Sequence, residues 1–457
     1  MMLLKKTTLT CISILFLLLA SCSSDSGPGY QEPYIPGTDD DSGEEPPAEP
    51  IADDELMDIV QETTFNYFWD FAEPNSGMAK ERSQADSYGG EGANIVTTGG
   101  TGFGLASFPA AVERGWITRT EAITRLDKII KFLENAPKFH GAFAHWYMGN
   151  TGTVRPFSQY DDGGDLVETA FLIQGLLINR QYFDDASAEE TDIRDRITTL
   201  WENVEWDWYT QGENVLYWHW SSTYDFQIDL QIKGWNEGLI VYVLAAASPT
   251  HPITKDVYTQ GWASNGNIVT NRSHYGINMP MGPSYGGPLF FSHYSFIGLD
   301  PTNLQDQYAN YWTQNTAHSQ INYQYCVLNP KDFKGYGPNS WGLTASDSRD
   351  GYAAHSPTND LGVITPTAAL SSIVYTPAES LAAMHYFYEE MGDTLWGEYG
   401  FYDAFSEQYN WTATGYLAID QGPIIAMIEN HRTGLLWQLF MQDTDVQAGL
   451  DLLEFTY

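Results

Sequence analysis

The sequence is poor in cysteine, in basic residues and in long apolar segments, and each shortage excludes a class of protein. Only three of its 457 residues are cysteines. Two of them, Cys11 and Cys22, lie in the N-terminal leader. The rest of the chain therefore has no disulfide framework and no zinc site of the usual Cys/His spacing. We expect the remaining one, Cys326, to be a small buried apolar residue.

Basic residues are scarce as well. The chain has 21 Lys and Arg against 59 Asp and Glu, for a formal net charge of −38. Such a balance argues against nucleic acid and against anionic lipid surfaces as partners. Aromatic residues make up 14% of the chain, a proportion that favours a neutral ligand stacking on rings.

The one long apolar run lies at the N-terminus, where residues 1–22 resemble a bacterial lipoprotein signal. Lys5 and Lys6 precede the apolar run 12–19, and small residues then lead to Cys22. The run is too short to span a bilayer. Cleavage before Cys22 would leave a lipidated N-terminal cysteine and tether the protein to the outer membrane of a Gram-negative bacterium, facing the periplasm or the cell surface. A plain secretory signal cut two residues earlier is the alternative.

The following segment, 23–54, contains ten acidic residues, six prolines and no Lys or Arg. It cannot bury apolar surface, so we expect a disordered acidic stalk. Residues 55–457 keep 49 acidic against 19 basic residues and contain no linker-like segment. We therefore expect one closed domain there, acting as a monomer.

Apolar spacing and helix-end signals predict a mostly helical domain with little sheet. The predicted helices are 56–71, 102–114, 119–135, 165–181, 192–202, 236–247, 253–262, 304–328, 377–391, 423–429 and 434–442. Short strand-like pieces are predicted at 141–148, 216–221 and 288–296.

The predicted helices are of two kinds. Segment 119–135 is amphipathic, which is typical of an outer helix, whereas 166–177 and 239–247 are apolar on all sides and should be buried. The buried helices open with polar or acidic residues. A ring of inner helices with their N-termini at one rim would gather these groups, so the sequence predicts an all-α fold, an (α/α) toroid with short hairpins and long loops at the rim.

Carboxylates at two predicted helix mouths indicate acid/base chemistry. One group, here named the Asp161 cluster, is Asp161, Asp162, Asp165 and Glu168, and the segment 233–238 repeats the design with Glu237. Hydrolysis of a glycosidic bond needs one carboxyl to protonate the leaving oxygen and another to act on water or the sugar. Glu237, beside Trp235, suits the proton donor, and the cluster suits the base. The alternative is that each acid caps its own helix.

Other signals are weaker. Nearby aromatic residues would form sugar-stacking platforms, although core packing explains each one separately. The ten histidines include no HExxH pair, and the segment 161–168 lacks the alternating spacing of a calcium loop. We therefore expect neither a catalytic metal nor a cofactor.

At these residues the chain resembles the bacterial β-1,2-glucan hydrolases of glycoside hydrolase family 144, whose domain is described as glucoamylase-like. The matching segments are 67–70, 77–79, 81–83, 101–105, 160–168, 234–237, 375–380, 419–423 and 428–430. The resemblance covers nearly the whole folded part and implies an (α/α)6 toroid that acts with inversion on β-1,2-linked glucose.

The resemblance also implies roles for individual residues. The family's essential acids fall on Asp161, Asp165, Glu168 and Glu237, with Glu237 as general acid and Asp161 as first choice for the residue that handles water. Implied or expected sugar-binding residues are Arg82, Trp146, Tyr160, Asp162, His219, Trp235, Glu379 and Asp420.

Several alternatives stay open. A non-catalytic glycan-binding lipoprotein would share the anchor, stalk and aromatic richness but needs no paired carboxylates. A polysaccharide lyase on this fold is disfavoured by the acidic balance, because lyases acting on uronates use Arg and Lys. A glucoamylase or an exo-acting β-glucosidase remains possible among hydrolases. The loops 262–294 and 329–363 are long enough to wall the cleft and so to decide between endo and exo attack.

Overall fold

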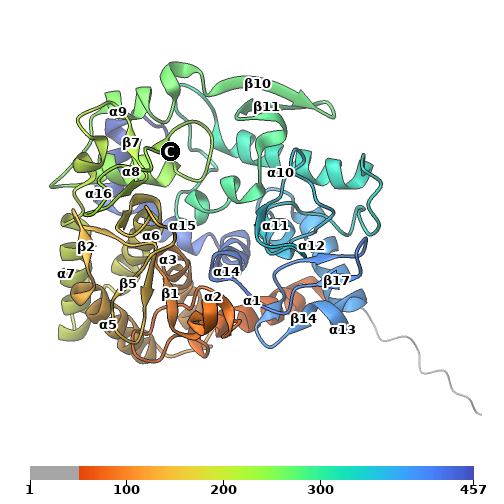
Figure 1. Cartoon of the computed structure of the whole chain (residues 1–457), viewed down its shortest axis with the longest axis horizontal. Coiled ribbons are helices and arrows are strands. Elements are labelled where there is room, and N and C mark those ends of the chain that lie inside the picture. The colour runs from red at the N-terminus through yellow and green to blue at the C-terminus, as the bar shows by residue number, and fades with distance from the viewer. Residues whose placement is uncertain (1–50) are drawn as a thin grey trace, which may run out of the picture. The chain divides into compact units, whose positions relative to one another are not determined.

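Helices are the main regular elements of the computed structural model, which describes residues 51–457 (Figure 1). The predicted signal 1–22 with lipidated Cys22, and residues 23–50 of the predicted stalk, lie outside the described residues and stay predictions. The end of the predicted stalk is wrong, because Asp53 and Asp54 already belong to the first helix. Residues 51–457 form one compact unit. Within that range no helix has the length and apolar character needed to cross a membrane.

The predicted all-α class is confirmed, and most predicted helices are present with shifted ends. The helices are α1 Asp53–Trp69, α2 Ser87–Gly90, α3 Thr98–Ala106, α4 Phe108–Glu113, α5 Arg119–Asn135, α6 Leu166–Tyr182, α7 Ala188–Glu202, α8 Leu239–Ala247, α9 Lys255–Gln260, α10 Tyr311–Leu328, α11 Pro366–Leu370, α12 Pro377–His385, α13 Gly392–Leu395, α14 Ala418–Arg432, α15 Leu435–Met441 and α16 Thr444–Leu452.

The strands are short and pair antiparallel in small sheets. They are β1 Ile95–Thr97, β2 Lys138–Phe139, β3 Ala142–Phe143, β4 Trp146–Met148, β5 Val154–Arg155, β6 Gly164–Asp165, β7 Leu216–Tyr217, β8 His219–Trp220, β9 Gln231–Ile232, β10 Val269–His274, β11 Ile277–Met281, β12 Ala345–Ser346, β13 Ala353–Ala354, β14 Trp396–Gly397, β15 Gly400–Phe401, β16 Phe405–Ser406 and β17 Trp411–Thr412.

The two predicted kinds of helix occupy the expected places. Every residue of α8 is buried, and so is almost all of α6, whereas α5 buries one face only. Figure 1 shows α3, α6 and α14 near the middle of the molecule and α5 and α7 at its periphery. Helix α3 packs between α6 and α14, and α6 also contacts α7 and α8. The buried helices thus form an inner layer and the amphipathic ones cover it.

Two predicted segments differ from the structure. Residues 288–296 form two 3₁₀ turns, Leu289–Ser292 and Ser295–Ile297, instead of a strand. The Phe290 and Tyr294 rings stack at 5.0 Å across one turn, so aromatic residues four apart share a face here. Helix α8 begins at Leu239 rather than at residue 236, with Gly238 as its N-cap residue. Glu237 therefore precedes the helix and does not cap it.

Helices α3 and α6 cross so closely that only glycine fits at the contact. A Cβ atom at Gly175 would lie 2.1 Å from the carbonyl oxygen of Gly102, and one at Gly102 would lie 2.2 Å from the carbonyl oxygen of Phe171. Neither neighbour is the end of a flexible side chain, so the backbones themselves would have to separate.

We expect Gly175→Ala to lower the free energy of unfolding by about 1–3 kcal/mol, because it overpacks this crossing. Urea unfolding followed by far-ultraviolet circular dichroism measures the change. Gly392→Ala is the matched control, since no atom lies within 4 Å of the position of its Cβ. Equal midpoints for the two variants would contradict the tight crossing.

Candidate functional site

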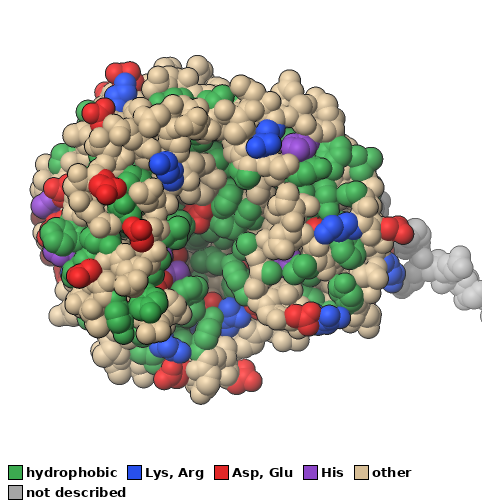
Figure 2. Space-filling model, turned by 45° about the horizontal axis from the view of Figure 1, so that its top comes forward, with side chains coloured by type: hydrophobic (Ala, Val, Ile, Leu, Met, Phe, Trp, Pro, Cys, Tyr) green, Lys and Arg blue, Asp and Glu red, His purple; other side chains and the backbone are tan. Residues whose placement is uncertain are grey.

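A cavity of about 410 Å³ lies within the ring of helices, a size typical of small-molecule sites. Figure 2 shows the hollow, with hydrophobic and acidic side chains at its wall. Its charged lining residues are Glu81, Arg82, His145, Arg155, Glu168 and Glu237. Its aromatic lining residues are Tyr88, Trp146, Phe157, Phe171, Trp218, Phe290, Tyr294 and Tyr352. The lining combines stacking surfaces with a few polar groups, as a neutral polyhydroxylated ligand requires.

Glu237 lies on the segment that joins β9 to α8. The Ser295 hydroxyl donates to the Glu237 carbonyl oxygen and accepts from the Ile240 amide, so the backbone of this segment is fixed. Burial of the side chain raises the pKa of Glu237 to about 7, and the charges of Asp165 and Glu168 add to the effect. The carboxyl can therefore carry a proton near neutral pH and release it within the cavity.

Glu168 lies in the first turn of α6 and is the one member of the Asp161 cluster that lines the cavity. The backbone amide of Gly99 donates to its Oε2 at 2.7 Å. Burial raises the pKa of Glu168 to about 7 although the nearby His145 ring opposes the rise. A Cβ atom at Gly99 would lie 2.7 Å from the same oxygen, so glycine is needed for this close approach.

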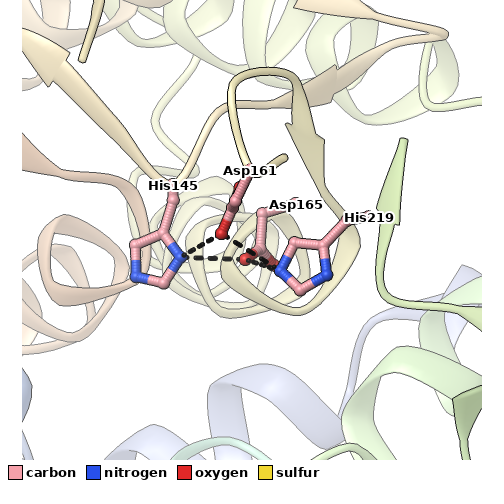
Figure 3. Close-up of side chains that lie close together, drawn as sticks. All are labelled: His145, Asp161, Asp165 and His219. Carbon is pink, nitrogen blue, oxygen red and sulfur yellow. Dashed lines mark hydrogen bonds and ion pairs between the residues drawn. The ribbon is translucent and has the colours of Figure 1, made fainter. Parts of the chain in front are cut away.

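Asp161 and Asp165 do not line the cavity; both contact two histidines, His145, which lines it, and His219 (Figure 3). The Asp165 Oδ2 lies 3.0 Å from His145 Nδ1 and 3.3 Å from His219 Nε2, while its Oδ1 accepts the amides of Val167 and Glu168. Burial alone would raise the pKa of Asp165, but His219 and His145 hold it below its ordinary range. Asp165 is thus the N-cap of α6, as the capping alternative predicts.

The same four residues could hold a metal ion. His145, Asp161, Asp165 and His219 each offer one ligand atom, and these atoms all lie within 4.8 Å of one another. No metal motif is recognisable in the sequence, because the ligands come from three separate segments. Gly163 lets two of these segments meet, since a Cβ there would lie 2.1 Å from the carbonyl oxygen of Trp220.

A second group of carboxyls surrounds Arg82. Its guanidinium binds Glu81 at 2.8 Å and Asp347 at 3.2 Å. The buried Asp403 accepts the Asp347 amide at 2.6 Å. Burial, together with the adjoining Asp403, raises the pKa of Asp420 well above its ordinary value, and no hydrogen-bond donor within the described residues contacts either oxygen of Asp420. The Asp403 and Asp420 carboxyls therefore behave as a pair that retains a proton.

The structure brings some predicted site residues to the cavity and not others. Arg82, Trp146, Glu168 and Glu237 line it. Asp161, Asp165, His219 and Asp420 contact or adjoin lining residues, whereas Tyr160, Asp162, Trp235 and Glu379 are absent from the lining.

Two of these placements correct the expected sugar-stacking and sugar-binding roles. Trp235 is absent from the cavity lining and packs in the core against Trp262 and Phe296, so its ring is not at the sugar site. Trp235 and Glu237 are close in the sequence, but the Trp235 ring lies in the core and Glu237 lines the cavity. Glu379 lies near Tyr323, and its carbonyl oxygen accepts the Trp341 indole, so it belongs to another part of the fold.

Sequence reasoning missed His145, Phe157, Tyr352 and Asp403. His145 immediately precedes Trp146 in a predicted strand, and this neighbour was the only available signal. The Phe157 ring stacks on His145 at 4.3 Å. Phe290 and Tyr352 come from the two loops expected to wall the cleft, and both do line the cavity.

Comparisons with known proteins identify relatives of the whole domain. The glucoamylase family model "Glycoamylase" matches residues 229–444. An endo-β-1,2-glucanase from Chitinophaga pinensis, solved with sophorotriose and glucose, is 54% identical; the match covers 89% of this chain and 99% of that one, with a TM-score of 0.87. A structure from Bacteroides fragilis described as a glucoamylase is 55% identical, with 90% and 99% covered and a TM-score of 0.87.

A curated relative from Parabacteroides distasonis is an exo β-1,2-glucooligosaccharide sophorohydrolase acting at the non-reducing end. It is 45% identical over 427 residues, which are 89% of this chain and 58% of that protein, so the chain spans less than two thirds of it. An endo-β-1,2-glucanase from Talaromyces funiculosus, 12% identical with a TM-score of 0.63, shares the fold. These likenesses confirm the predicted (α/α)6 class.

We expect Asp420→Asn to be more stable than the wild type at pH 8, and this advantage to be smaller at pH 5. The folded-state pKa of Asp420 is raised, so the stability gained from its proton is present at low pH and lost as pH rises above about 4. Asparagine cannot ionise and should therefore remove this loss, by about 1 kcal/mol or more at pH 8. Thermal unfolding of the wild type and the variant at both pH values measures this difference in stability.

The control for this experiment is Asp393→Asn, at an exposed position. Its effect on the melting temperature should be the same at pH 5 and pH 8. If Asp420→Asn also changed the melting temperature equally at pH 5 and pH 8, the Asp420 carboxyl of the wild type would have an ordinary pKa.

Proposed function

This chain belongs to the glucoamylase-like β-1,2-glucan hydrolases of glycoside hydrolase family 144, and from that premise we propose that it hydrolyses β-1,2-linked glucan or its oligosaccharides by an inverting acid/base mechanism. The observation that carries the proposal is the presence of two carboxyls, the half-buried Glu237 and the buried Glu168, in the wall of one aromatic cavity. A protein that only bound glycan would need the rings but not the carboxyls.

Glu237 is the proton donor in this proposal. Its burial keeps the carboxyl protonated near neutral pH, so it can transfer a proton to the glycosidic oxygen as the bond breaks. Helix capping does not compete for it, because Gly238 occupies the N-cap position of α8.

We infer that the water-facing carboxyl is Glu168 rather than Asp161, the first choice from the sequence. The Oδ2 of Asp161 lies 3.2 Å from His219 and 3.6 Å from His145, and Asp161 does not line the cavity. Glu168 does line it. A group that acts on water or sugar has to reach the substrate, and geometry therefore favours Glu168.

Substrate positioning follows from the rest of the lining. Arg82 is held by Glu81 and Asp347 and presents its remaining donors near the cavity, while Trp146, Phe157 and Tyr352 offer ring faces. Neutral glucose units bind through such rings and through hydrogen bonds to hydroxyl groups. The cavity offers both.

The products formed from linear β-1,2-glucan test the proposal. We expect cleavage of this polymer, with laminarin, cellulose and starch left intact. Mixed oligosaccharides would establish endo attack, as in the Chitinophaga relative, and sophorose alone would establish exo attack, as in the Parabacteroides relative. No cleavage of any of these glucans would sink the proposal and favour a glycan-binding protein.

Glu237→Gln should lower kcat by about 10²-fold or more, because the side chain keeps its shape but has no proton to donate. In the wild type the rate should also fall above about pH 7, where Glu237 loses its proton, and fall below it, where Glu168 gains one. Stopped assays of reducing ends across pH 5 to 9 measure both effects.

Glu62→Gln, an exposed change on α1, is the control and should leave the rate and its pH profile unchanged. A Glu237→Gln variant that turns over at the wild-type rate would rule out the donor role.

A further inference from the structure

The four side chains drawn in Figure 3 each offer one ligand atom, and these atoms all lie within 4.8 Å of one another. The nitrogen–oxygen distances from His145 Nδ1 are 3.0 Å to Asp165 Oδ2 and 3.6 Å to Asp161 Oδ2. From His219 Nε2 they are 3.3 Å and 3.2 Å to the same two oxygens. Ligands at 2.0–2.2 Å from a tetrahedral zinc lie roughly 3.3–3.6 Å apart. The four nitrogen–oxygen distances are close to that spacing, and the two remaining pairs of ligand atoms lie within 4.8 Å, so a small shift of the side chains would close the site around an ion.

The backbone holds these ligands in place before any ion binds. Asp165 in β6 pairs directly with His219 in β8, and a bridge between Ala144 and Gly164 brings the His145 segment alongside. Asp161 lies on the loop that leads into β6. Three segments far apart in the sequence are therefore fixed by main-chain pairing, which lowers the ordering cost of binding.

Surrounding groups orient the ligands, as is usual around protein-bound zinc. Asp165 uses Oδ1 to cap α6, which leaves Oδ2 for the site. The Trp218 indole donates to that Oδ2 at 3.3 Å. On the far side of its ring, His145 Nε2 lies 3.9 Å from Glu168 Oε1, and the Phe157 ring stacks on its face.

The donor set indicates which ion fits. Two imidazole nitrogens and two carboxylate oxygens suit zinc and related divalent ions, whereas calcium and magnesium prefer oxygen ligands alone. Asp161 is 5% exposed and Asp165 is fully buried. A divalent ion would balance these two carboxylates and leave the site neutral.

We propose that His145, Asp161, Asp165 and His219 bind one divalent metal ion of the zinc class and that this site is structural. Four protein ligands fill a tetrahedral shell and leave no position for water or substrate, which is the pattern of structural zinc. The ion would fix the loop bearing Asp161 against the N-terminus of α6 and, through the His145 ring, the surroundings of Glu168. Consecutive ligands are 16, 4 and 54 positions apart, a spacing that matches no known metal-binding motif.

Metal uptake by the purified protein tests this proposal, and the measurement does not depend on whether the protein cleaves glucan. The protein is stripped with a chelator, mixed with Zn²⁺, desalted and analysed for metal by mass spectrometry. We expect about one ion per chain. Co²⁺ added to the stripped wild type should give the intense visible absorption of a tetrahedral site. This measurement uses the wild type alone, so it remains valid if a variant fails to fold.

His219→Gln and Asp161→Asn should each weaken Zn²⁺ binding at least about tenfold. His251→Gln should bind as the wild type does; that histidine also contacts an aspartate, Asp207 at 3.1 Å, but belongs to no such group. Wild-type protein that retains no zinc, or variants that bind as well as the wild type, would overturn the proposal and leave the four side chains as an ion-pair network. Because no substrate is present, either result is independent of glucan cleavage.

Discussion

The central constraint on this fold is the burial of many carboxyl groups at the middle of a ring of apolar helices. A carboxylate removed from water needs a cation, several donors or a proton. The molecule uses all three. Arg82 balances Glu81 and Asp347, while the histidine pair faces Asp161 and Asp165. Burial raises the pKa of Glu168, Glu237 and Asp420, which have too few partners to stay charged at low cost.

These groups cannot move apart, because the inner helices leave them no room. Helices α3 and α6 touch through glycine at Gly102 and Gly175, and Gly99 approaches Glu168 in the same manner. The tight inner layer therefore places the carboxyl of α6 against a backbone donor of α3. Packing that stabilises the ring also determines the chemistry of its cavity, so activity and stability depend on the same contacts.

Local signals predicted the fold well and the site only in part. Apolar spacing and helix-end signals predicted both ends of α5 correctly, and in the structure a Thr118–Glu121 capping box begins this helix. By contrast, the hairpin β10–β11 was missed because most of its residues are polar and half-buried or exposed. Trp235 was assigned to the cavity from its neighbour in the sequence, but tertiary packing turns its ring into the core. His145 and Asp403 entered no motif, since their partners lie in distant segments.

Two similar helix mouths in the sequence serve different purposes in the structure. Asp165 is the N-cap of α6, and both of its oxygens accept hydrogen bonds or face histidines. Glu237 precedes Gly238, so the equivalent helix needs nothing from its side chain. A carboxyl with committed oxygens is stabilised as an anion, whereas an uncommitted buried one tends to keep its proton. The position of the N-cap residue thus separates the helix-capping acid from the proposed proton donor, a distinction that sequence spacing alone does not make.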